Sequence, residues 1–362
     1  MMPPRKAALI EIAGSHNETL YSQLLYLKHY NYHTTLICSA NLKEHVQGMD
    51  CADETVYFGF DSGNPEQERK QTKELHKYLT DNKIDTIILN TAHGRTIRNF
   101  LLYRFPKGTV IAGTLHGINK LRGSLTQKII SWRMGRYYLL NDYLKENLYM
   151  VPHKGLRFEV FYPMFFQQLP YAPAVVKPQD EIWIGVPGSV EFKRRDYMTL
   201  VDVLAKMPVK LNYKFLLLGD GDHPHGNFKE LKAAIEAAGL LSYFKFWHGY
   251  LGNAEFHAYI EQCDAVMPLI HPINDDLKKY LNDQISGSYN LAFAYKKPLL
   301  MHRYFEKYAD FKENAIFYSL DTLDTCLMNF TQEVAERQGQ FYQHPKWTLE
   351  YQAEQYVRLL QQ

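Results

Sequence analysis

The chain has 362 residues, of which 46% are hydrophobic, and its 41 Lys and Arg nearly balance 39 Asp and Glu, giving a formal net charge of +2. So large an apolar share with so little net charge excludes an intrinsically disordered chain, and the length predicts two domains. The four cysteines form no CxxC pair and no Cys/His ligand spacing, so the sequence indicates neither a disulfide framework nor a zinc site. Glu11 interrupts the first apolar segment, which predicts a strand and not a signal peptide, and no run of 18 apolar residues occurs. We expect a cytoplasmic protein without a membrane-spanning helix.

Strands and helices alternate through the first 167 residues. The apolar patterns predict strands at 7–13, 34–39, 84–90, 109–117 and 157–165. Helices are predicted around Leu20, Leu24 and Leu27 and over about 66–82. Such alternation is typical of a parallel sheet covered by helices on both faces. Residues 1–167 are therefore assigned to an N-terminal domain.

The same alternation restarts after a Pro-rich segment at 168–179, which we interpret as a linker. Strands predicted at 182–187, 214–218, 243–249, 265–270 and 298–302 make 180–340 a second domain of the same class. A polar insertion occupies 271–283, and residues 341–362 predict a terminal helix that packs back on the first domain. The expected fold is α/β, with two doubly wound Rossmann-like domains facing a central cleft. In such sheets ligands bind outside the carboxyl ends of the strands.

Glycine-bearing loops follow many of the predicted strands. They are Gly14-Ser15-His16, His116-Gly117, Gly188-Ser189, Gly219-Asp220-Gly221, His248-Gly249 and Ser286-Gly287-Ser288. The last loop precedes an apolar helix, whose first-turn N–H groups and dipole favour a phosphate. The alternative is that Ser286 only N-caps this helix. Neither a Walker A lysine motif nor a GxGxxG fingerprint occurs, which argues against an NTPase and a hydride-transfer enzyme.

The order of these loops resembles the donor half of GT-B glycosyltransferases, and most of all the family-4 (group 1) enzymes. The segments that carry the resemblance are GSVEFKRRD, LLLGDGD, FKFWHGYL, CDAVMPL and ISGSYNLAFAYKKPLL within residues 180–305, with TLHG at 114–117 and LRFEVFYP in the first half. The resemblance implies the GT-B fold, a nucleotide-sugar as donor substrate, no further cofactor and no metal ion. It implies that the donor-binding residues are Gly14, Ser15, Gly188, Ser189, Arg194, Gly219, His248, Gly249, Ser286, Gly287 and Ser288.

The sequence also departs from the family pattern. Arg194 stands where the family has a diphosphate-binding Lys, and Ser189 stands where Arg is usual. Asp283 occupies the first position of the family's E-x7-E segment, but Leu291 occupies the second, which binds ribose in the family. Because Leu291 cannot accept a hydrogen bond, the segment is degenerate and the ribose contact is absent or comes from elsewhere.

His16, His116 and Asp283 are the candidate catalytic residues. An imidazole has an ordinary pKa near 6.5, so His16 could take the proton of an acceptor hydroxyl; the alternative is a helix-start residue beside an Asn17 cap. His116 could orient the donor sugar or phosphate, or be a loop histidine bonded to backbone. The remaining loop histidines, interpreted as solvated and without a third metal ligand at a suitable spacing, are His223, His225 and His271.

Charge is distributed unevenly along the chain. The 56 residues between Asp85 and Asp142 contain no acid and nine basic residues, interleaved with aromatic residues such as Trp132. Three interpretations remain open: a solvated positive face, a contact with an anionic membrane or lipid pyrophosphate, and nucleic acid. No nucleic-acid-binding motif accompanies the charge, so nucleic acid is not an expected partner.

Together these features predict a metal-independent glycosyltransferase, cytoplasmic or peripheral at the inner face of the membrane. It would move a hexosyl-type sugar from a nucleotide-sugar to a glycan or lipid-linked acceptor, bound on the N-terminal domain, in cell-surface polysaccharide synthesis. One alternative is a catalytically inactive GT-B-like protein that binds sugar nucleotides. Others are a polysaccharide pyruvyl transferase and a nucleotide-sugar epimerase. An epimerase needs acid/base carboxylates, and only Glu11, Glu191 and Asp283 lie near the candidate loops.

Overall fold

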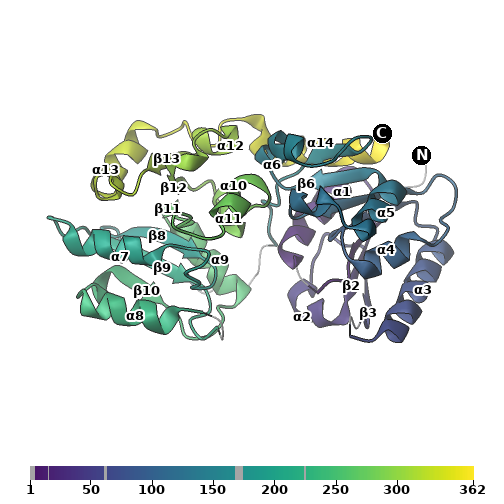
Figure 1. Ribbon diagram of the computed structural model, residues 1–362, viewed down its shortest axis with the longest axis horizontal. Coiled ribbons are helices and arrows are strands. Elements are labelled where there is room, and N and C mark those ends of the chain that lie inside the picture. The colour runs from purple at the N-terminus through teal and green to yellow at the C-terminus, as the bar shows by residue number, and fades with distance from the viewer. Residues whose placement is uncertain (1–4, 15, 61–62, 168–173, 224–225) are drawn as a thin grey trace. The chain divides into compact units, whose positions relative to one another are not determined.

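The computed structural model describes residues 5–14, 16–60, 63–167, 174–223 and 226–362. The chain divides into two compact units, which are Met1–Gln167 together with Pro345–Gln362, and Gln168–His344. Each unit contains one sheet of parallel strands with helices beside it (Figure 1). The prediction of two doubly wound α/β domains is thereby confirmed. The second unit runs to His344, and the chain returns to the first unit from Pro345.

Unit 1 is built on a seven-stranded parallel sheet in the order β3-β2-β1-β4-β5-β6-β7. Its strands are β1 Lys6–Glu11, β2 His33–Ser39, β3 Glu54–Phe58, β4 Thr86–Leu89, β5 Val110–Leu115, β6 Arg136–Leu139 and β7 Arg157–Val160. The central strands are buried on both faces, since every residue of β4 and all of β1 after Lys6 are buried. The edge strand β3 was not predicted, because it is only half-buried and has no continuous apolar run.

The helices of unit 1 include α3, α4 and α5 in a neighbouring series, with α4 in contact with both others (Figure 1). The helical segments are η1 Asn17–Thr19, α1 Leu20–His29, η2 Ala40–Leu42, α2 Lys43–Val46, α3 Pro65–Asp81, α4 Arg95–Leu101, η3 Ile118–Arg122, α5 Leu125–Met134, α6 Asp142–Glu146, η4 Asn147–Met150, η7 Pro345–Trp347 and α14 Leu349–Gln361.

The C-terminal helix α14 packs against α1, β5 and β7 of unit 1. Tyr356 is fully buried and stacks on Tyr138, with ring centroids 4.2 Å apart. Its hydroxyl donates to Gln23 Oε1 at 2.9 Å, and Arg358 holds both carboxylate oxygens of Glu159 at 3.0 Å. The amphipathic pattern that predicts a helix in the last segment thus places its apolar side on the core of unit 1.

Unit 2 contains a six-stranded parallel sheet in the order β10-β9-β8-β11-β12-β13. Its strands are β8 Ile182–Pro187, β9 Tyr213–Leu218, β10 Phe244–Phe246, β11 Ala265–Val266, β12 Leu299–His302 and β13 Ala315–Tyr318. Its helical segments are α7 Tyr197–Lys206, α8 Phe228–Ala237, η5 Leu241–Tyr243, α9 Asn253–Gln262, α10 Leu277–Asn282, α11 Gly287–Ala294, η6 Arg303–Phe305, α12 Ala309–Lys312 and α13 Leu323–Glu336. Helix α10 lies inside the segment predicted to be a polar insertion, where its short length leaves little periodicity to detect.

Candidate functional site

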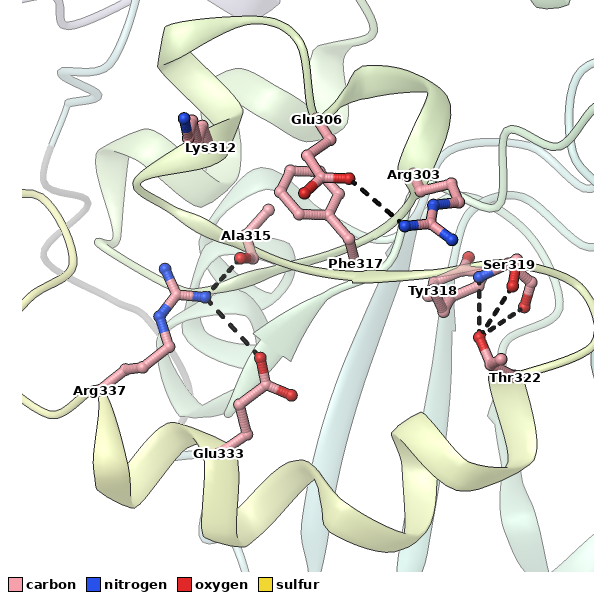
Figure 2. Close-up of a pocket in the computed structure, with 10 residues that line it drawn as sticks. All are labelled: Arg303, Glu306, Lys312, Ala315, Phe317, Tyr318, Ser319, Thr322, Glu333 and Arg337. Carbon is pink, nitrogen blue, oxygen red and sulfur yellow. Dashed lines mark hydrogen bonds and ion pairs between the residues drawn. The ribbon is translucent and has the colours of Figure 1, made fainter.

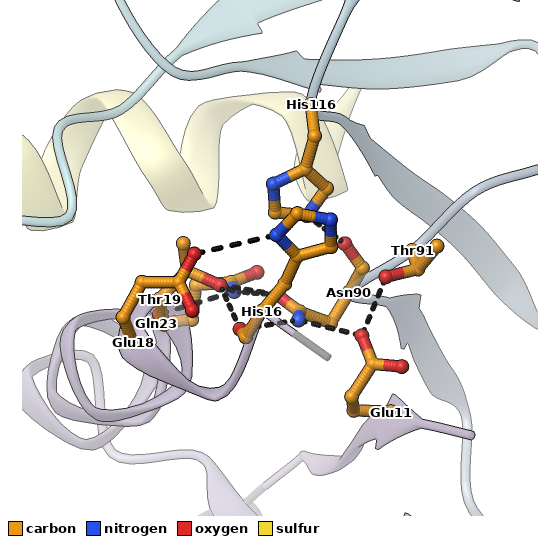
Figure 3. Close-up of polar contacts among 8 residues, drawn as sticks. All are labelled: Glu11, His16, Glu18, Thr19, Gln23, Asn90, Thr91 and His116. Atoms are coloured by element: carbon orange, nitrogen blue, oxygen red, sulfur yellow. Dashed lines mark hydrogen bonds and ion pairs between the residues drawn. The ribbon is translucent and has the colours of Figure 1, made fainter. Parts of the chain in front are cut away.

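A polar cluster lies at the carboxyl end of the central strands of unit 1, with Asn90 at its centre (Figure 3). The Asn90 amide nitrogen donates to Glu11 Oε2 at 2.8 Å and to the His16 carbonyl at 3.0 Å. Its side-chain oxygen accepts hydrogen bonds from Thr19 and Gln23, both at 2.6 Å. Since Asn90 is fully buried, these bonds fix the loops after β1 and β4 relative to one another.

Glu11 is a fully buried carboxylate at the end of β1. It accepts hydrogen bonds from the Thr91 hydroxyl and the Ala13 amide, both at 2.6 Å, in addition to the one from Asn90. Burial raises the pKa of Glu11, although the bonds from Thr91 and Asn90 oppose this rise. The cluster therefore contains a carboxyl group that holds its proton more tightly than an exposed glutamate.

The backbone after β1 turns sharply to place His16 above this cluster. Gly14 has a φ of 73°, and a Cβ there would lie 2.5 Å from the side-chain nitrogen of Asn41. His16 also has a left-handed backbone, with a φ of 63°, and is the N-cap of η1 without a side-chain capping bond. A left-handed non-glycine residue is strained by on the order of 1–2 kcal/mol, and such strain often marks functional sites. Ser15, predicted to contact the donor, lies outside the described residues.

His16 and His116 form a stacked pair, with ring centroids 3.7 Å apart and an interplanar angle of 14°. His16 Nδ1 lies 3.3 Å from Glu18 Oε1. His116 Nε2 lies 2.8 Å from the Asn90 carbonyl oxygen, which can only accept, so Nε2 carries the proton and Nδ1 keeps its lone pair. The structure thus brings the two predicted catalytic histidines together, and His116 is also backbone-bonded, as in the alternative interpretation.

The histidines of this cluster differ in their affinity for protons. Burial alone would lower the pKa of His16, but the hydrogen bond and the charge of Glu18 raise it above the ordinary value. Burial and the charge of His16 lower the pKa of His116 to about 3. Burial, Lys120 and His16 lower that of His93 to about 4. Near neutral pH His93 and His116 are therefore neutral, whereas Glu18 favours the protonated form of His16.

The His16, Glu18 and His116 ligand atoms lie within 4.8 Å of one another, a spacing that a metal ion accepts. The ring geometry fits an ion less well. An imidazole lone pair lies in its own ring plane, and the two stacked rings have separate, nearly parallel planes. One ring would have to turn before a single ion could meet both lone pairs.

In unit 2, the loops after β8 and β9 approach each other closely through glycines. A Cβ on Gly219 would lie 2.3 Å from the Gly188 carbonyl oxygen, and one on Gly221 would lie 2.5 Å from the Trp247 carbonyl oxygen. Gly188 has a φ of 101°, and a Cβ there would strike the guanidinium of Arg195 at 2.5 Å. The predicted residues Gly188, Ser189 and Gly219 are therefore brought together at the carboxyl ends of β8 and β9.

Arg195 fills the space beside Gly188. Only 9% of its surface is exposed, and its Nη1 donates to the Ser189 carbonyl at 3.2 Å. Among the described residues its buried Nε has no hydrogen-bond partner. Burial raises the pKa of Tyr289 in α11, and the charge of Arg195 opposes this rise. A buried cation with an unpaired donor beside a glycine loop at the end of a strand is suited to an anion.

Arg194, the residue predicted to bind diphosphate, has other partners. Its Nη1 lies 3.5 Å from Glu191 Oε1, and its side chain is partly exposed. Burial alone would lower the pKa of Arg194, but Tyr280 and Glu191 raise it. Arg194 could still reach a ligand, and its assignment stays a prediction.

The Ser286-Gly287-Ser288 loop begins α11, and Ser286 is its N-cap, accepting from the Ser288 amide at 3.4 Å. Gly287 is exposed, and a Cβ there would meet nothing within 4 Å. The capping interpretation of Ser286 therefore agrees with the structure. The Tyr289 amide donates to the Ser286 carbonyl at 3.0 Å, so among the described first-turn amides that of Gly287 is left for an anion. Asp283 lies at the end of α10, where its amide donates to the Lys279 carbonyl at 2.8 Å, and Leu291 is buried.

His248 and Gly249 lie on the exposed loop after the edge strand β10. His248 Nδ1 lies 3.6 Å from Asp222 Oδ1, and both side chains are largely exposed. This pair connects the loop after β10 to the loop after β9. The donor contacts predicted for His248 and Gly249 remain predictions.

His271 is not a solvated loop residue, so this prediction was wrong. It is fully buried, with Nδ1 2.8 Å from Asp196 Oδ2 and Nε2 2.8 Å from the Tyr318 hydroxyl. Asp196 also caps α7 by accepting from the Thr199 amide at 3.1 Å. The network joins the loop that carries Arg195 to the segment after β11 and to β13. The polar residues that follow His271 in the sequence are typical of an exposed loop, and its hydrogen-bond partners Asp196 and Tyr318 lie far away in the sequence. The sequence therefore did not indicate that His271 is buried.

Tyr318→Phe tests this network through stability. It leaves a buried nitrogen of His271 without its partner, which should lower the free energy of unfolding by about 1–3 kcal/mol. Tyr304 is an exposed tyrosine close by in the sequence, so the control Tyr304→Phe should change it by less than about 0.5 kcal/mol. Urea unfolding measures both values, and equal stabilities would show that the network contributes little.

No protein-family model and no curated protein matches this sequence. Solved structures of similar fold nevertheless cover nearly the whole chain. A glycosyltransferase from Rickettsia africae is 14% identical, with a TM-score of 0.61 over 99% of this chain and 94% of that chain. The Anabaena protein HepE, solved in complex with UDP and glucose, is 14% identical, with a TM-score of 0.62 over 98% and 95% of the two chains. A UDP-GlcNAc 2-epimerase from Methanocaldococcus jannaschii is 13% identical, with a TM-score of 0.61 over 98% and 99%.

The chain has the GT-B fold. Likeness at this identity establishes the GT-B fold alone, because both transferases and epimerases share it. The more specific resemblance to family 4, with its E-x7-E segment, stays a prediction.

Sequence reasoning missed several residues of this GT-B chain that belong to the two clusters. They are Glu18, Asn90, His93, Arg195, Asp196 and His271. The asparagine directly follows a buried strand, a position at which polar residues gather at one sheet edge. Arg195 directly follows Arg194 in a charged stretch of the sequence, and nothing in that stretch indicated its burial.

A cavity of about 420 Å³ lies beside the edge strand β13 of unit 2 (Figure 2), and its lining includes none of the residues predicted to act. Its charged side chains interact with one another, as Arg303 does with Glu306 and Arg337 with Glu333, both at 3.9 Å. Arg337 also donates to the Ala315 carbonyl at 2.6 Å and so covers part of the open strand edge. At least one residue of the cavity wall, Arg337, therefore helps to cover the unpaired edge of β13.

Within the described parts of the chain, no helix combines the length and the apolar character needed to cross a bilayer.

Proposed function

We propose that this GT-B protein is a glycosyltransferase that moves a sugar from a nucleotide-sugar to an acceptor hydroxyl. The observation that carries the proposal is Arg195, a buried guanidinium beside Gly188 whose Nε has no hydrogen-bond partner among the described residues. A leaving nucleoside diphosphate carries the charge that such a group would stabilise. HepE, with a similar fold, was solved with UDP and glucose, which supports a nucleotide-sugar as the donor.

Unit 2 would stabilise the leaving group. The Arg195 Nε and the Gly287 amide at the start of α11 are donors that exist before the ligand arrives, so little reorganisation is needed when the sugar–phosphate bond breaks. The close approach of Gly188 and Gly219 leaves backbone where a side chain would otherwise block a phosphate. We propose that these groups, without a metal ion, bind the diphosphate, and that Asp283 and the loop of His248 contribute contacts to the sugar or the base.

Unit 1 would activate the acceptor. His16 holds a proton with a raised pKa through Glu18, so in its neutral form it is a stronger base than an ordinary imidazole. His116 keeps its Nδ1 lone pair and remains neutral because its pKa is about 3, so it could accept a hydrogen bond from a sugar hydroxyl. We propose that the acceptor is a glycan or a lipid-linked sugar used in cell-surface polysaccharide synthesis.

A thermal-shift panel of nucleoside diphosphates and nucleotide-sugars tests the donor class. A ligand present at 100 times its dissociation constant stabilises the folded state by about 2.7 kcal/mol. A stabilising nucleotide-sugar is then incubated with candidate acceptors, and the glycosylated product is measured. Stabilisation by no member of the panel would contradict the proposal, and binding without transfer would favour an inactive sugar-nucleotide-binding protein, as Leu291 suggests.

Substitutions in the loop before α11 separate anion binding from capping. Gly287→Val should leave the melting temperature nearly unchanged, because its Cβ meets nothing within 4 Å, but should prevent a diphosphate from approaching the first-turn amides. Ser286→Ala removes the cap and should cost about 1 kcal/mol of stability. Titration calorimetry with the diphosphate, beside the melting temperatures, measures both effects. Unchanged affinity in Gly287→Val would remove this loop from the phosphate site.

A nucleotide-sugar epimerase is the second candidate. The observation in its favour is that Glu11 and Glu18 join His16 at one sheet edge of unit 1, which supplies the acid/base carboxylates that such a reaction requires. Parallel incubations of the stabilising nucleotide-sugar in deuterated water, one without and one with candidate acceptors, distinguish the two activities. Deuterium in the recovered sugar would indicate epimerisation, whereas acceptor-dependent release of the diphosphate would indicate transfer.

A further inference from the structure

Helix α5 presents apolar and basic side chains to solvent on one face. Leu125, Lys128 and Trp132 are spaced at i, i+3 and i+7, so they share a side of the helix. Leu125 is 75% exposed and Trp132 is 77% exposed, and Lys128 is also exposed. The opposite side of α5 is buried in unit 1, where Gln127 donates to the Ala92 carbonyl and to the Tyr137 hydroxyl. We call the exposed side, made of these three residues with Leu102 and Arg133, the α5 face.

Arg133 joins α5 to the end of α4 and so extends the face. Its Nε donates to the Leu101 carbonyl at 2.7 Å and its Nη2 to the Tyr103 carbonyl at 2.9 Å. Its guanidinium lies 5.6 Å from the centre of the Trp132 ring. Leu102, between the two bonded carbonyls, is 57% exposed. The hydrogen bonds from Arg133 thus fix the backbone on either side of Leu102 relative to α5.

The surroundings of the α5 face are basic. The segment between Asp85 and Asp142 contains no acid, and the exposed side chains next to the face in sequence include Arg104, Lys107 and Arg122. Helix α3 carries acids, but α4 lies between α3 and α5 (Figure 1). One of these acids, Glu68, turns inward to Arg95 and Asn99 of α4. The α5 face therefore combines a tryptophan and two leucines with the exposed basic side chains of Lys128 and Arg133.

We propose that the α5 face docks on an anionic lipid bilayer. A tryptophan ring suits the headgroup region, where its apolar body and polar N–H are both satisfied. Long basic side chains reach lipid phosphates while their stems stay on apolar surface. A solvated face would explain the lysines and arginines but not the two leucines and the tryptophan exposed among them. The proposal does not rest on the proposed function, since docking requires neither donor nor acceptor.

Co-sedimentation of the full chain with vesicles tests this proposal. Vesicles of phosphatidylcholine with phosphatidylglycerol should bind the protein, vesicles of phosphatidylcholine alone should bind it weakly, and raising NaCl from about 0.1 M to about 0.5 M should release it. Trp132→Ala with Lys128→Glu should lower the partition coefficient about tenfold or more. The matched controls are Tyr250→Ala, an aromatic residue 75% exposed in unit 2, and Lys73→Glu on α3, and neither should reduce binding.

Tryptophan fluorescence provides a second readout. Trp183 and Trp347 are buried and Trp247 of unit 2 is half-buried, so the part of a blue shift on adding anionic vesicles that comes from Trp132 is the part that disappears in Trp132→Phe. Equal binding to neutral and anionic vesicles, or binding unaffected by both α5 substitutions, would overturn the proposal. Self-association in the absence of lipid that Trp132→Ala abolishes would assign the face to a second copy of the chain and also overturn it.

Discussion

Arg195→Ala should weaken the binding of a nucleoside diphosphate by about 10- to 150-fold and that of the nucleoside alone only slightly. The reason is the position of the guanidinium, which is buried beside Gly188 with an Nε that lacks a partner among the described residues. A hydrogen bond to a charged group contributes about 1.5–3 kcal/mol, which corresponds to this range. Titration calorimetry with the diphosphate and with its nucleoside measures the two affinities.

Two further variants make this result specific. Arg194→Ala is the matched control, because Arg194 comes from the same loop but pairs with Glu191 and interacts with Tyr280. If Arg194 also touches the diphosphate, as the resemblance implies, its loss should weaken binding too, and the larger effect identifies the principal contact. Arg195→Lys keeps the charge but loses the planar fork, so partial rescue is expected. Equal losses for diphosphate and nucleoside would show that Arg195 does not contact phosphate.

The fold could be predicted from the sequence because its strongest signals are local. Strand β1 is an apolar run buried along nearly its whole length, and α3 begins at a proline after an Asn64 cap, which are features that a single stretch of sequence reveals. The elements that escaped prediction are short or half-exposed, namely β3 and α10. Their stability comes from neighbours distant in the sequence, so their own residues show little periodicity.

The candidate site was harder to predict for the same reason. The sequence correctly singled out His16 and His116 as close to strand ends, and the structure stacks them. Their protonation, however, depends on Glu18 and on Asn90, and neither residue belongs to a recognisable motif. In unit 2 the resemblance directed attention to Arg194, whereas burial, which no local pattern revealed, distinguishes its neighbour Arg195. His271 shows the same effect. Its neighbours in the sequence are polar, but in the structure it is buried and bonded to Asp196 and Tyr318.

His16→Ala should lower the turnover number by about 10²- to 10⁴-fold, the usual contribution of a general base, while the affinity for the donor stays nearly unchanged. The proposal assigns the donor to unit 2 and the base to unit 1, so the two quantities should separate. His29→Ala is the matched control, because His29 is an exposed histidine at the end of α1, and it should leave turnover unchanged. Near-wild-type turnover in His16→Ala would remove this residue from the mechanism, and His116 would become the next candidate.

The pH dependence distinguishes a base from a residue that only supports the loop. A general base acts when neutral, so the rate should rise with pH through the pKa of His16, and Glu18 raises that pKa above its ordinary value near 6.5. Glu18→Gln removes the negative charge, so the acidic limb of the pH–rate profile should move to lower pH. Because the pKa of His16 is higher in the folded state than in the unfolded state, protonation of His16 stabilises the folded state below about pH 6.5. This stabilisation should be lost as the pH rises through the pKa of His16 in the folded state. A purely structural His16 would show this stability change without a matching shift of the acidic limb in Glu18→Gln.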